Sequence, residues 1–560
     1  MQGHCPHLDQ SIFKLVYGNS QSHGVQGILL CGEQSTPHNK IPYLIQARSA
    51  ISNHDGDYYK LEKPLVSAPK LSDQSKQPVV AQDQICSGIN CSLRIQEMDN
   101  SLTQNQSGHS HAVVIGGSIA GLLAAKVLLN HFDRVTLIER DHLPDQPSFR
   151  PGVPQSQHVH VLLTQGQRLL EQLFPGLLGE LNLAGAPTVN WTTDWRMLGL
   201  WGWFPRCQAG LIGVACSRVL LEWLIHRRLT AYKNLTIFQA CQVKGLLSSP
   251  DQSRIIGVKV SQRHAQPQSG QLPDDSLVAD LVVDASGRNS ALPAWLTALG
   301  YAAPKETIIN AFLGYASRWY QRPEGLQVDW QGITIAAQPT QHSRGGTLFP
   351  IEGDRWIVTL GGMGQEQPST DEQGFLEFAG SLRNRLIYDA IKEAQPLSPV
   401  YSYRRTENRW RHYEHLSRLP DGIVAVGDSV CAFNPVYGQG MTVAALGALA
   451  LDQCLKTVDA HKLRSPGLTP QFQKQLAQIV ANPWAMATAE DCRWATTEGP
   501  RPNCFASLLQ AYSDQVVMLS TQEPAIFRTF AKVVHMVEPP TALFQPQIFV
   551  QALAHYFRWQ

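Results

Sequence analysis

Three observations on the amino-acid sequence predict an α/β fold. Residues 111–141 combine a short apolar strand, a glycine turn, a helix with apolar spacing and a second strand that ends on an acid. Residues 303–397 change to short strands separated by turn residues, which is typical of an antiparallel sheet. Residues 421–455 place another apolar strand before a glycine-rich loop and a long helix of small residues.

The segment 111–141 has the pattern of a complete dinucleotide-binding βαβ unit. Gly116, Gly117 and Gly121 form the tight turn and allow the helix to pack closely on the strand. Ser118 stands where a third glycine usually admits a pyrophosphate, and its hydroxyl could bond a phosphate oxygen at the helix N-terminus. Glu139 ends the second strand, near the separation of about 20 positions at which a carboxylate accepts the hydroxyls of an adenosine ribose. The segment therefore predicts a Rossmann-type nucleotide site.

Length and composition limit the class of protein. The chain has 560 residues, of which 43% are hydrophobic, and a formal net charge of +1, so two or more packed units fit and nucleic-acid binding is not expected. The 11 cysteines are irregularly spaced without a CxxC pair, which favours free thiols in a reducing compartment and predicts no metal site. Because no run of 18 apolar residues occurs, we expect a cytoplasmic protein.

The first 110 residues differ from the remainder. They are rich in Gln, Ser, Asn, His and Asp and contain only short apolar stretches, so we expect a disordered or loosely attached segment. An alternative is a reading frame extended beyond the native start, because a short polar lead from Met98 runs directly into the first strand.

Several residues after the first unit are candidates for a ligand site. His158 and His160 lie where a proline-rich loop meets a helical pattern; we favour one exposed and one backbone-bonded histidine over ligand binding or proton transfer. Arg218 lies at the start of an amphipathic helix and could reach a phosphate or ribose, although isolated arginines usually lie at the surface. Four tryptophans at residues 190–205 favour aromatic strands that line an apolar cavity.

The later segments supply further candidates. Asp284 ends a buried strand beside a small-residue turn, where α/β folds place ligand contacts, and residues 261–275 are expected to form a hairpin tip. Asp428 ends the third apolar strand, and the N–H groups of the helix from Met441 can hold negative charge on a ligand. Four residues of the antiparallel sheet are candidates for lining a cavity: Tyr315, Arg318, Arg344 and Tyr403. For each of them, a position on the surface or a role in packing is an equally good interpretation. The aromatic tail at 542–560 should dock on the core, with a membrane surface as the alternative.

Taken together, GGSIAG with Glu139, DASGR at 284–288 and GDSVCAFNPVYGQGMT from Gly427 resemble the FAD-dependent oxidoreductases of the aromatic-hydroxylase superfamily. More narrowly, RPGVPQSQHVHVLL, RGGTLFPIEGDRWIVTL and FNPVYGQGM resemble its polyprenyl-methoxyphenol hydroxylase-like or geranylgeranyl reductase-like branch. The resemblance implies a Rossmann-type FAD-binding domain with an inserted antiparallel-sheet substrate domain and a helical C-terminal region. The expected boundaries are 1–110 for the extension, 111–302 and 409–456 for the FAD-binding domain, 303–408 for the sheet domain and 457–560 for the helical region.

The resemblance also implies residue roles. The glycine turn with Ser118 would cradle the pyrophosphate, Glu139 would hold the adenosine ribose, Asp428 would bind the ribityl chain, and residues 438–441 would lie beside the flavin pyrimidine. The expected cofactor-binding residues are Gly116, Gly117, Ser118, Gly121, Glu139, Arg140, Arg218, Asp284, Gly287, Arg288, Asp428, Pro435, Gly438, Gln439, Gly440 and Met441. The sequence departs from the usual pattern in having Ala285 where the second motif has glycine, and Cys431 and Thr442 where His and Asn are frequent.

The function implied is that of a monooxygenase in which NAD(P)H reduces FAD and O2 hydroxylates or epoxidises an apolar or aromatic substrate. An isoprenoid reductase and a redox-neutral flavin-binding cyclase are the alternatives, and no residue is assigned as catalytic. The string Trp201-Gly202-Trp203-Phe204-Pro205 superficially resembles the tryptophan motif of flavin-dependent halogenases. Its position before DASGR and its missing isoleucine argue against halogenation.

Overall fold

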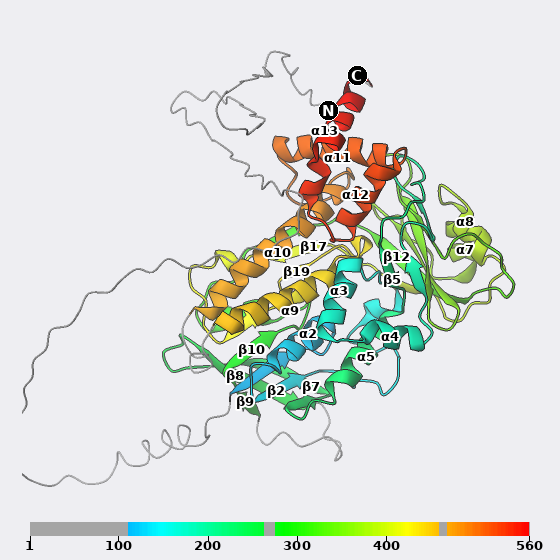
Figure 1. Ribbon diagram of the computed structural model, residues 1–560. Helices are drawn as coiled ribbons and strands as arrows, with labels where there is room; N and C mark the ends of the chain where they lie inside the picture. The colour runs from blue at the N-terminus through cyan, green and yellow to red at the C-terminus, as the bar shows by residue number, and fades with distance from the viewer. Residues whose placement is uncertain (1–109, 263–274, 458–466, 559–560) are drawn as a thin grey trace, which may run out of the picture. The chain divides into compact units, whose positions relative to one another are not determined.

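The computed structural model describes residues 110–262, 275–457 and 467–558 (Figure 1). The chain divides into two units, 1–94 and 95–560, and every described residue belongs to the second unit. The expectations for the N-terminal segment up to residue 109 and for most of the hairpin tip at 261–275 therefore lie outside the described residues.

A five-stranded parallel sheet forms the centre of the α/β half, in the order β18-β10-β1-β2-β6. The strands are β1 (His111–Ile115), β2 (Arg134–Ile138), β6 (Leu235–Phe238), β10 (Leu281–Asp284) and β18 (Ile423–Ala425). All residues of β1 and β10 are buried, as expected where helices cover a parallel sheet. Helices α2 (Ile119–Leu128), α9 (Gly440–Thr457) and α10 (Leu468–Asp491) lie side by side along this sheet (Figure 1). The expected Rossmann-type α/β fold is confirmed.

The register of this sheet gathers the motif segments at one edge. Ile115 at the end of β1 is paired with Ile138 on β2 and with Asp284 on β10, and Asp284 is paired with Ala425 on β18. The glycine turn, Glu139, the DASGR loop and Asp428 all follow these aligned strand ends. In open α/β sheets, ligands bind at this carboxyl edge.

The second large sheet has six strands in the order β16-β12-β15-β14-β13-β4. Its strands are β4 (Trp195–Leu198), β12 (Gly314–Gln321), β13 (Gly332–Ile335), β14 (Arg344–Ile351), β15 (Arg355–Gly362) and β16 (Tyr401–Tyr403). Neighbours are antiparallel except for β4, which pairs in parallel with β13. The sheet thus takes in a strand from before residue 303. Helices α7 (Glu372–Gly380) and α8 (Leu386–Ile391) pack against it.

Residues 306–321 do not form one continuous strand. Phe312 has a φ of +53°, so the chain turns there and divides the segment between two sheets. Strand β11 (Glu306–Ile309) pairs with β17 (Asn408–Arg411), which in turn pairs with β19 (Cys431–Ala432), while β12 starts only at Gly314. This small three-stranded sheet connects the sheet domain to the segment that carries Asp428.

The remaining elements complete the two halves. They include β3 (Thr188–Asn190), β5 (Ile212–Val214), β7 (Cys241–Ser248), β8 (Ile255–Gln262), β9 (Ser276–Val278), α3 (Thr164–Leu173), α4 (Leu177–Leu183), α5 (Arg218–Leu229) and α6 (Leu292–Ala298). Strands β8 and β9 pair antiparallel, as the two arms of the expected hairpin should.

The C-terminal region is helical, with α11 (Cys504–Ser520), α12 (Pro524–Val534) and α13 (Pro546–Arg558) after α10. In α13, Ile548 and Ala552 are buried in one cluster with Val516 and Leu519 of α11. The tail therefore docks on a neighbouring helix. None of the helices in the described ranges is long and apolar enough to cross a membrane.

Candidate active site

The glycine turn after β1 is shaped by close contacts that exclude side chains. Gly116 has a φ of +100°, and a Cβ there would lie 2.6 Å from the Ala285 carbonyl oxygen. A Cβ on Gly121 would lie 1.8 Å from the Gly116 carbonyl oxygen. Ser118 is the N-cap of α2 but makes no side-chain capping bond, so the first N–H groups of this helix remain available to an anion.

Glu139 is held at the mouth of this turn and is only 4% exposed. Its Oε2 accepts a hydrogen bond of 2.7 Å from the Gly117 N–H, and its Oε1 accepts one of 3.0 Å from the Asp141 N–H. Arg150 forms an ion pair with the same carboxylate at 3.3 Å. Because Arg150 and Gly117 both contact Oε2, the further lone pair lies on Oε1, where the group can still accept a hydroxyl donor.

Two arginines and Glu222 form a buried ionic cluster beside the turn. Arg150 donates to Glu222 at 2.7 Å and to the Gly117 carbonyl at 3.1 Å. Arg218, 6% exposed, donates to Glu222 at 2.6 Å and to the Ser118 hydroxyl at 2.8 Å. Burial acts to raise the pKa of Glu222, but the two guanidinium groups outweigh burial and hold this pKa below its ordinary value.

This cluster changes the expectations for two residues. The surface alternative for Arg218 is wrong, because its guanidinium reaches the glycine turn. The Ser118 hydroxyl, expected to face a phosphate, donates to Glu222 at 3.0 Å in this structure. A small pocket opens beside these groups and is lined by Gly117, Arg150, Arg218 and Glu222 among others. Arg150 and Glu222 were missed from the sequence, although Glu222 lies one helical turn after Arg218.

Hydrogen bonds between its own residues hold the DASGR loop in place. The Asp284 carboxylate is 0% exposed and accepts bonds from the Ser286 N–H and from the hydroxyls of Ser286 and Ser290. Burial is the main cause that raises its pKa. Arg288 donates to the carbonyls of Glu407 and Phe433. In this structure the Asp284 and Arg288 side chains hold these loops together, and their expected contact with a cofactor stays a prediction.

Three other residues expected to bind the cofactor are exposed or have empty space beside them. A Cβ on Gly287 would meet no atom within 4 Å, although its φ of +83° disfavours any side chain. Arg140 is exposed and makes only a long bond of 3.4 Å to the Gly152 carbonyl. Pro435 is exposed at the start of the short helix η4 (Pro435–Tyr437).

Asp428 is the carboxylate at this sheet edge with the most lone pairs free to accept hydrogen bonds. It is half-buried three residues after the end of β18, and its carboxylate accepts no hydrogen bond from any residue that the structure describes. Burial raises its pKa, while Arg288 acts in the opposite direction as the leading positive charge. A partly desolvated carboxylate without donors is suited to accept hydroxyl groups from a ligand.

The start of α9 also presents unused polar groups. The Oε1 of Gln439 and the Oγ1 of Thr442 are buried without a hydrogen-bond partner in the described residues. The first N–H groups of a helix have no intrahelical acceptor, so those at Gly440 and Met441 are available. A Cβ on Gly440 would meet no protein atom within 4 Å. Gly438, in the preceding loop, has a φ of +66°.

A fully buried carboxylate at the end of α10 anchors this loop. Asp491 accepts bonds from the Asn408 amide at 2.6 Å, the Asn434 amide at 3.0 Å and the Tyr437 hydroxyl at 2.6 Å. Burial is the largest effect on Asp491 and raises its pKa to about 6. No local pattern identifies Asp491, because its partners lie more than 50 positions away in the chain.

An aromatic cluster faces the same region from the six-stranded sheet. The rings of Tyr315 on β12 and Tyr403 on β16 stack at 5.5 Å, and the His158 ring lies 4.7 Å from Tyr315. Burial raises the pKa of both tyrosines, and Arg288 acts on both in the opposite direction. Asp428 also acts on the pKa of Tyr403, so the cluster lies within electrostatic range of the loop that follows β18.

The expectation that one of His158 and His160 is exposed is wrong. His158 is 1% exposed, and its Nδ1 lies 2.7 Å from the Ser317 hydroxyl. His160 is half-buried, and its Nδ1 bonds the His158 carbonyl, as expected for one of the pair. Burial lowers the pKa of His158 to about 3, so its ring is neutral near pH 7.

The proton position on His158 follows from its partners. The Val159 N–H donates to the Thr359 hydroxyl at 3.1 Å, and that hydroxyl lies 2.6 Å from Ser317. Both hydroxyl hydrogens form hydrogen bonds if the Thr359 hydroxyl donates to Ser317 and the Ser317 hydroxyl donates to Nδ1 of His158. The imidazole proton then lies on Nε2, which is buried without a partner in the described residues.

The other cavity candidates have packing roles. Arg318 forms an ion pair with Glu372, and Arg344 forms one with Glu366. Trp191 and Trp195 are buried in a core cluster with Phe349, whereas Trp201 is exposed. The tryptophan-rich patch is therefore mostly core packing.

The chain has the fold of known flavoenzymes. The flavin-dependent brominase Bmp2 superposes with a TM-score of 0.56 at 14% identity, covering 80% of this chain and 100% of that chain. The flavin-dependent halogenase CmlS gives 0.54 at 15% identity over 77% and 78% of the two chains. PqsL from Pseudomonas aeruginosa, a probable FAD-dependent monooxygenase, gives 0.50 at 15% identity over 69% and 98%. At these identities the similarity establishes the fold alone.

No family model matches the sequence. Protein Rv3254 of Mycobacterium tuberculosis (strain ATCC 25618 / H37Rv) is 32% identical over 460 residues, which cover 80% of this chain and 94% of that protein. The chain belongs to the same family as Protein Rv3254.

Proposed function

We propose that the protein binds FAD and acts as an NAD(P)H-dependent monooxygenase on an apolar or aromatic small molecule. Asp428 is the observation that carries the flavin assignment, because this partly desolvated carboxylate has no donor among the described residues. It follows β18 in the same sheet edge as the glycine turn and Glu139. A ribityl chain offers hydroxyl donors at this position, whereas a nicotinamide dinucleotide has no such chain.

The residues present fit this cofactor. The glycine turn has no side chain to obstruct a pyrophosphate, and the free N–H groups of α2 would hold its charge. Glu139 would accept the hydroxyls of the adenosine ribose, and Asp428 those of the ribityl chain. The open first turn of α9 at Gly440 would favour negative charge on a ring oxygen. Bound FAD would supply the redox chemistry with NAD(P)H and O2.

The aromatic cluster supports an apolar or aromatic substrate. Tyr315, Tyr403 and His158 form a nearly dry wall, and the neutral His158 offers one Nε2–H donor within it. An aromatic surface with a few hydrogen-bonding groups, here the two tyrosine hydroxyls and the imidazole, suits a flat, largely apolar molecule. The names of the structurally similar flavoenzymes agree with an oxidoreductase, and the narrower hydroxylase-like or reductase-like branch rests on the sequence resemblance.

The variant Asp428→Asn tests the proposal that the protein binds FAD. Loss of charge-assisted hydrogen bonds should weaken FAD binding by about 10- to 100-fold, measured by fluorescence titration of the apoprotein. Asp389→Asn, which alters an exposed carboxylate on α8, is the matched control and should bind FAD like the unmodified chain. Equal FAD affinity in all three proteins would remove the support that Asp428 provides.

The reaction is tested by stopped-flow spectra and O2 uptake with NADH and NADPH, using a panel of phenols, quinones and isoprenoids with product mass spectrometry. We expect a substrate to accelerate bleaching of the flavin and one product to gain oxygen. Bleaching with a hydrogenated product and no O2 uptake would indicate the isoprenoid reductase instead. If no donor bleaches the flavin, the monooxygenase proposal fails and a redox-neutral role remains.

A further inference from the structure

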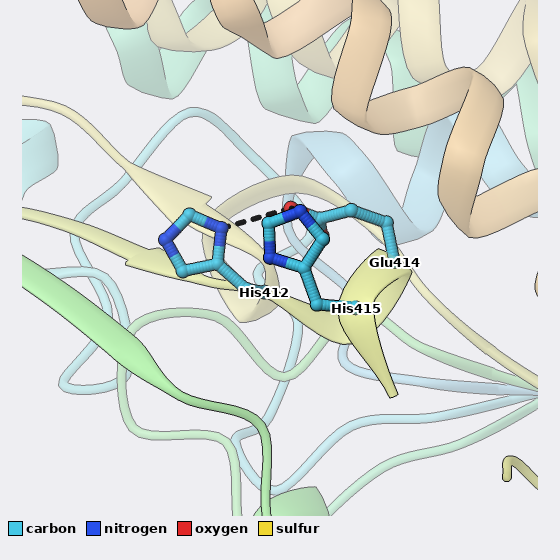
Figure 2. Close-up of side chains that lie close together, drawn as sticks. All are labelled: His412, Glu414 and His415. Atoms are coloured by element: carbon cyan, nitrogen blue, oxygen red, sulfur yellow. Dashed lines mark hydrogen bonds and ion pairs between the residues drawn. The ribbon is translucent and has the colours of Figure 1, made fainter. Parts of the chain in front are cut away.

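Three potential metal ligands lie together on the turn that follows β17 (Figure 2). They are His412 and two residues of the short helix η2 (Tyr413–His415), namely Glu414 and His415. His412 Nδ1 lies 2.8 Å from Glu414 Oε1, and His415 Nε2 lies 3.9 Å from the same oxygen. Ligand atoms from all three residues lie within 4.8 Å of one another.

These distances are close to those of a tetrahedral metal site. Bonds of about 2.0–2.2 Å from Zn²⁺ to imidazole nitrogen and carboxylate oxygen place neighbouring ligand atoms about 3.3 Å apart. The observed distances of 2.8 and 3.9 Å lie on either side of this value. The His412 and Glu414 side chains are largely buried and define two positions, while His415 is 71% exposed and can move to complete the third.

A hydrogen bond on the far side of His412 has the arrangement of a metal ligand. His412 Nε2 lies 2.8 Å from the Thr307 hydroxyl on β11. Metal-bound histidines commonly donate their other ring N–H to an oxygen, which fixes the tautomer. If Nε2–H donates to Thr307, a lone pair on Nδ1 faces the Glu414 carboxylate at 2.8 Å. Such a pair is repulsive unless a proton or a cation lies between them.

The buried charge of Glu414 also supports a bound cation. The side chain is 10% exposed, and its ion-pair partners in the described ranges are the two histidines, with no Lys or Arg among them. A desolvated carboxylate is costly without a compensating positive charge. A divalent cation bound between the three side chains would supply that positive charge.

We propose that His412, Glu414 and His415 bind a divalent first-row transition cation, with Zn²⁺ as the best match and water at the fourth position. Two imidazoles and one carboxylate are a donor set that suits this class of cation. The inference is independent of the proposed function. It also revises the expectation of no metal site, which rested on the spacing of the cysteines.

The proposed role is structural. Arg411, which immediately precedes His412, donates to the Ser429 carbonyl at 3.0 Å and to the Arg288 carbonyl at 2.9 Å. Both acceptors lie in loops of the candidate active site. A metal on the next residues would fix the end of β17 and thereby the arginine that joins these loops.

The test uses the full-length chain, stripped with a chelator and titrated with ZnCl2 by calorimetry, in unmodified, His415→Ala and His342→Ala forms. His342 is exposed elsewhere on the sheet domain, so its variant is the matched control for loss of a surface histidine. We expect the unmodified chain and the control to hold one zinc ion that His415→Ala binds at least about 10-fold more weakly. Zinc should raise the Tm of the first two proteins, and the metal-free Tm of all three should be the same because His415 is exposed.

Glu414→Gln is a second variant that keeps the volume of the side chain and removes its charge; it should lose the same zinc ion. Equal zinc binding by all four proteins would place the metal on other residues and overturn the proposal. Absence of saturable zinc binding would also overturn it and would leave His412 and Glu414 as a proton-bridged pair.

Discussion

At the residue scale, Gly440 offers the most selective probe of a bound ligand. A Cβ at this position meets no protein atom within 4 Å, yet the residue begins α9 at the proposed flavin ring. Gly440→Ala should therefore leave the apoprotein as stable or slightly more stable, since alanine favours a helix by up to about 1 kcal/mol over glycine. FAD affinity should fall by about 10-fold or more, because only the ligand can meet the new methyl group. Thermal unfolding and FAD titration measure the two effects.

Gly179→Ala is the control for this prediction. Gly179 also lies in a helix, α4, and its added Cβ also meets nothing within 4 Å. This variant should change neither FAD affinity nor any spectrum of the bound flavin. A Gly440→Ala protein that binds FAD as well as Gly179→Ala would show that no ligand approaches the start of α9.

The residues predicted from sequence were those that local backbone geometry requires. Gly116 and Gly121 were identifiable because a strand-to-helix turn excludes side chains, and Asp428 because it closely follows a buried apolar strand. Arg150 and Asp491 were not identified, because their partners Glu222 and Asn408 are distant in sequence. The burial of His158 was missed for the same reason, since Ser317 and Thr359 come from another sheet. Glu222 was missed although one of its partners, Arg218, lies only one helical turn before it.

At the element scale, α10 connects the helical region to the proposed flavin loop through Asp491. Its carboxylate satisfies three buried donors, on Asn408, Asn434 and Tyr437. Burial raises its pKa to about 6, so the folded chain binds this proton more tightly than the unfolded chain. The contribution to stability is therefore complete below the ordinary pKa of aspartate and is lost as the pH rises through about 6.

Asp491→Asn should remove this pH dependence. The free energy of unfolding of the unmodified chain should lose about 2 kcal/mol relative to the variant between pH 4 and pH 7, given about 1.4 kcal/mol per pKa unit. Denaturant unfolding at a series of pH values measures the difference between the two proteins. Parallel pH profiles would contradict the assignment of this raised pKa to Asp491.

Element prediction succeeded where periodicity was local. The strands of the parallel sheet and most of the antiparallel sheet follow from apolar runs and alternation. The division of residues 306–321 between two sheets did not, because the turn depends on a positive φ at Phe312, which a phenylalanine rarely adopts. The parallel addition of β4 to β13 depends on tertiary contacts between distant segments.

At the scale of the whole molecule, every residue assigned to the site follows residue 110. A chain that begins at Met98 should therefore bind FAD with the affinity of the full-length chain and unfold at the same Tm. Titration and thermal unfolding of the two purified proteins test this directly. A loss of FAD binding on removal of residues 1–97 would show that the site needs a contribution from that segment.

The central claim is that the edge of the parallel sheet holds one FAD. The most direct measurement is the flavin bound per chain after reconstitution of the full-length protein, with cofactor identity read by chromatography after denaturation. We predict one FAD per chain, with FMN and NAD⁺ unable to replace it, because the site uses both the adenosine and the ribityl ends. A chain that shows no saturable FAD binding would contradict the account.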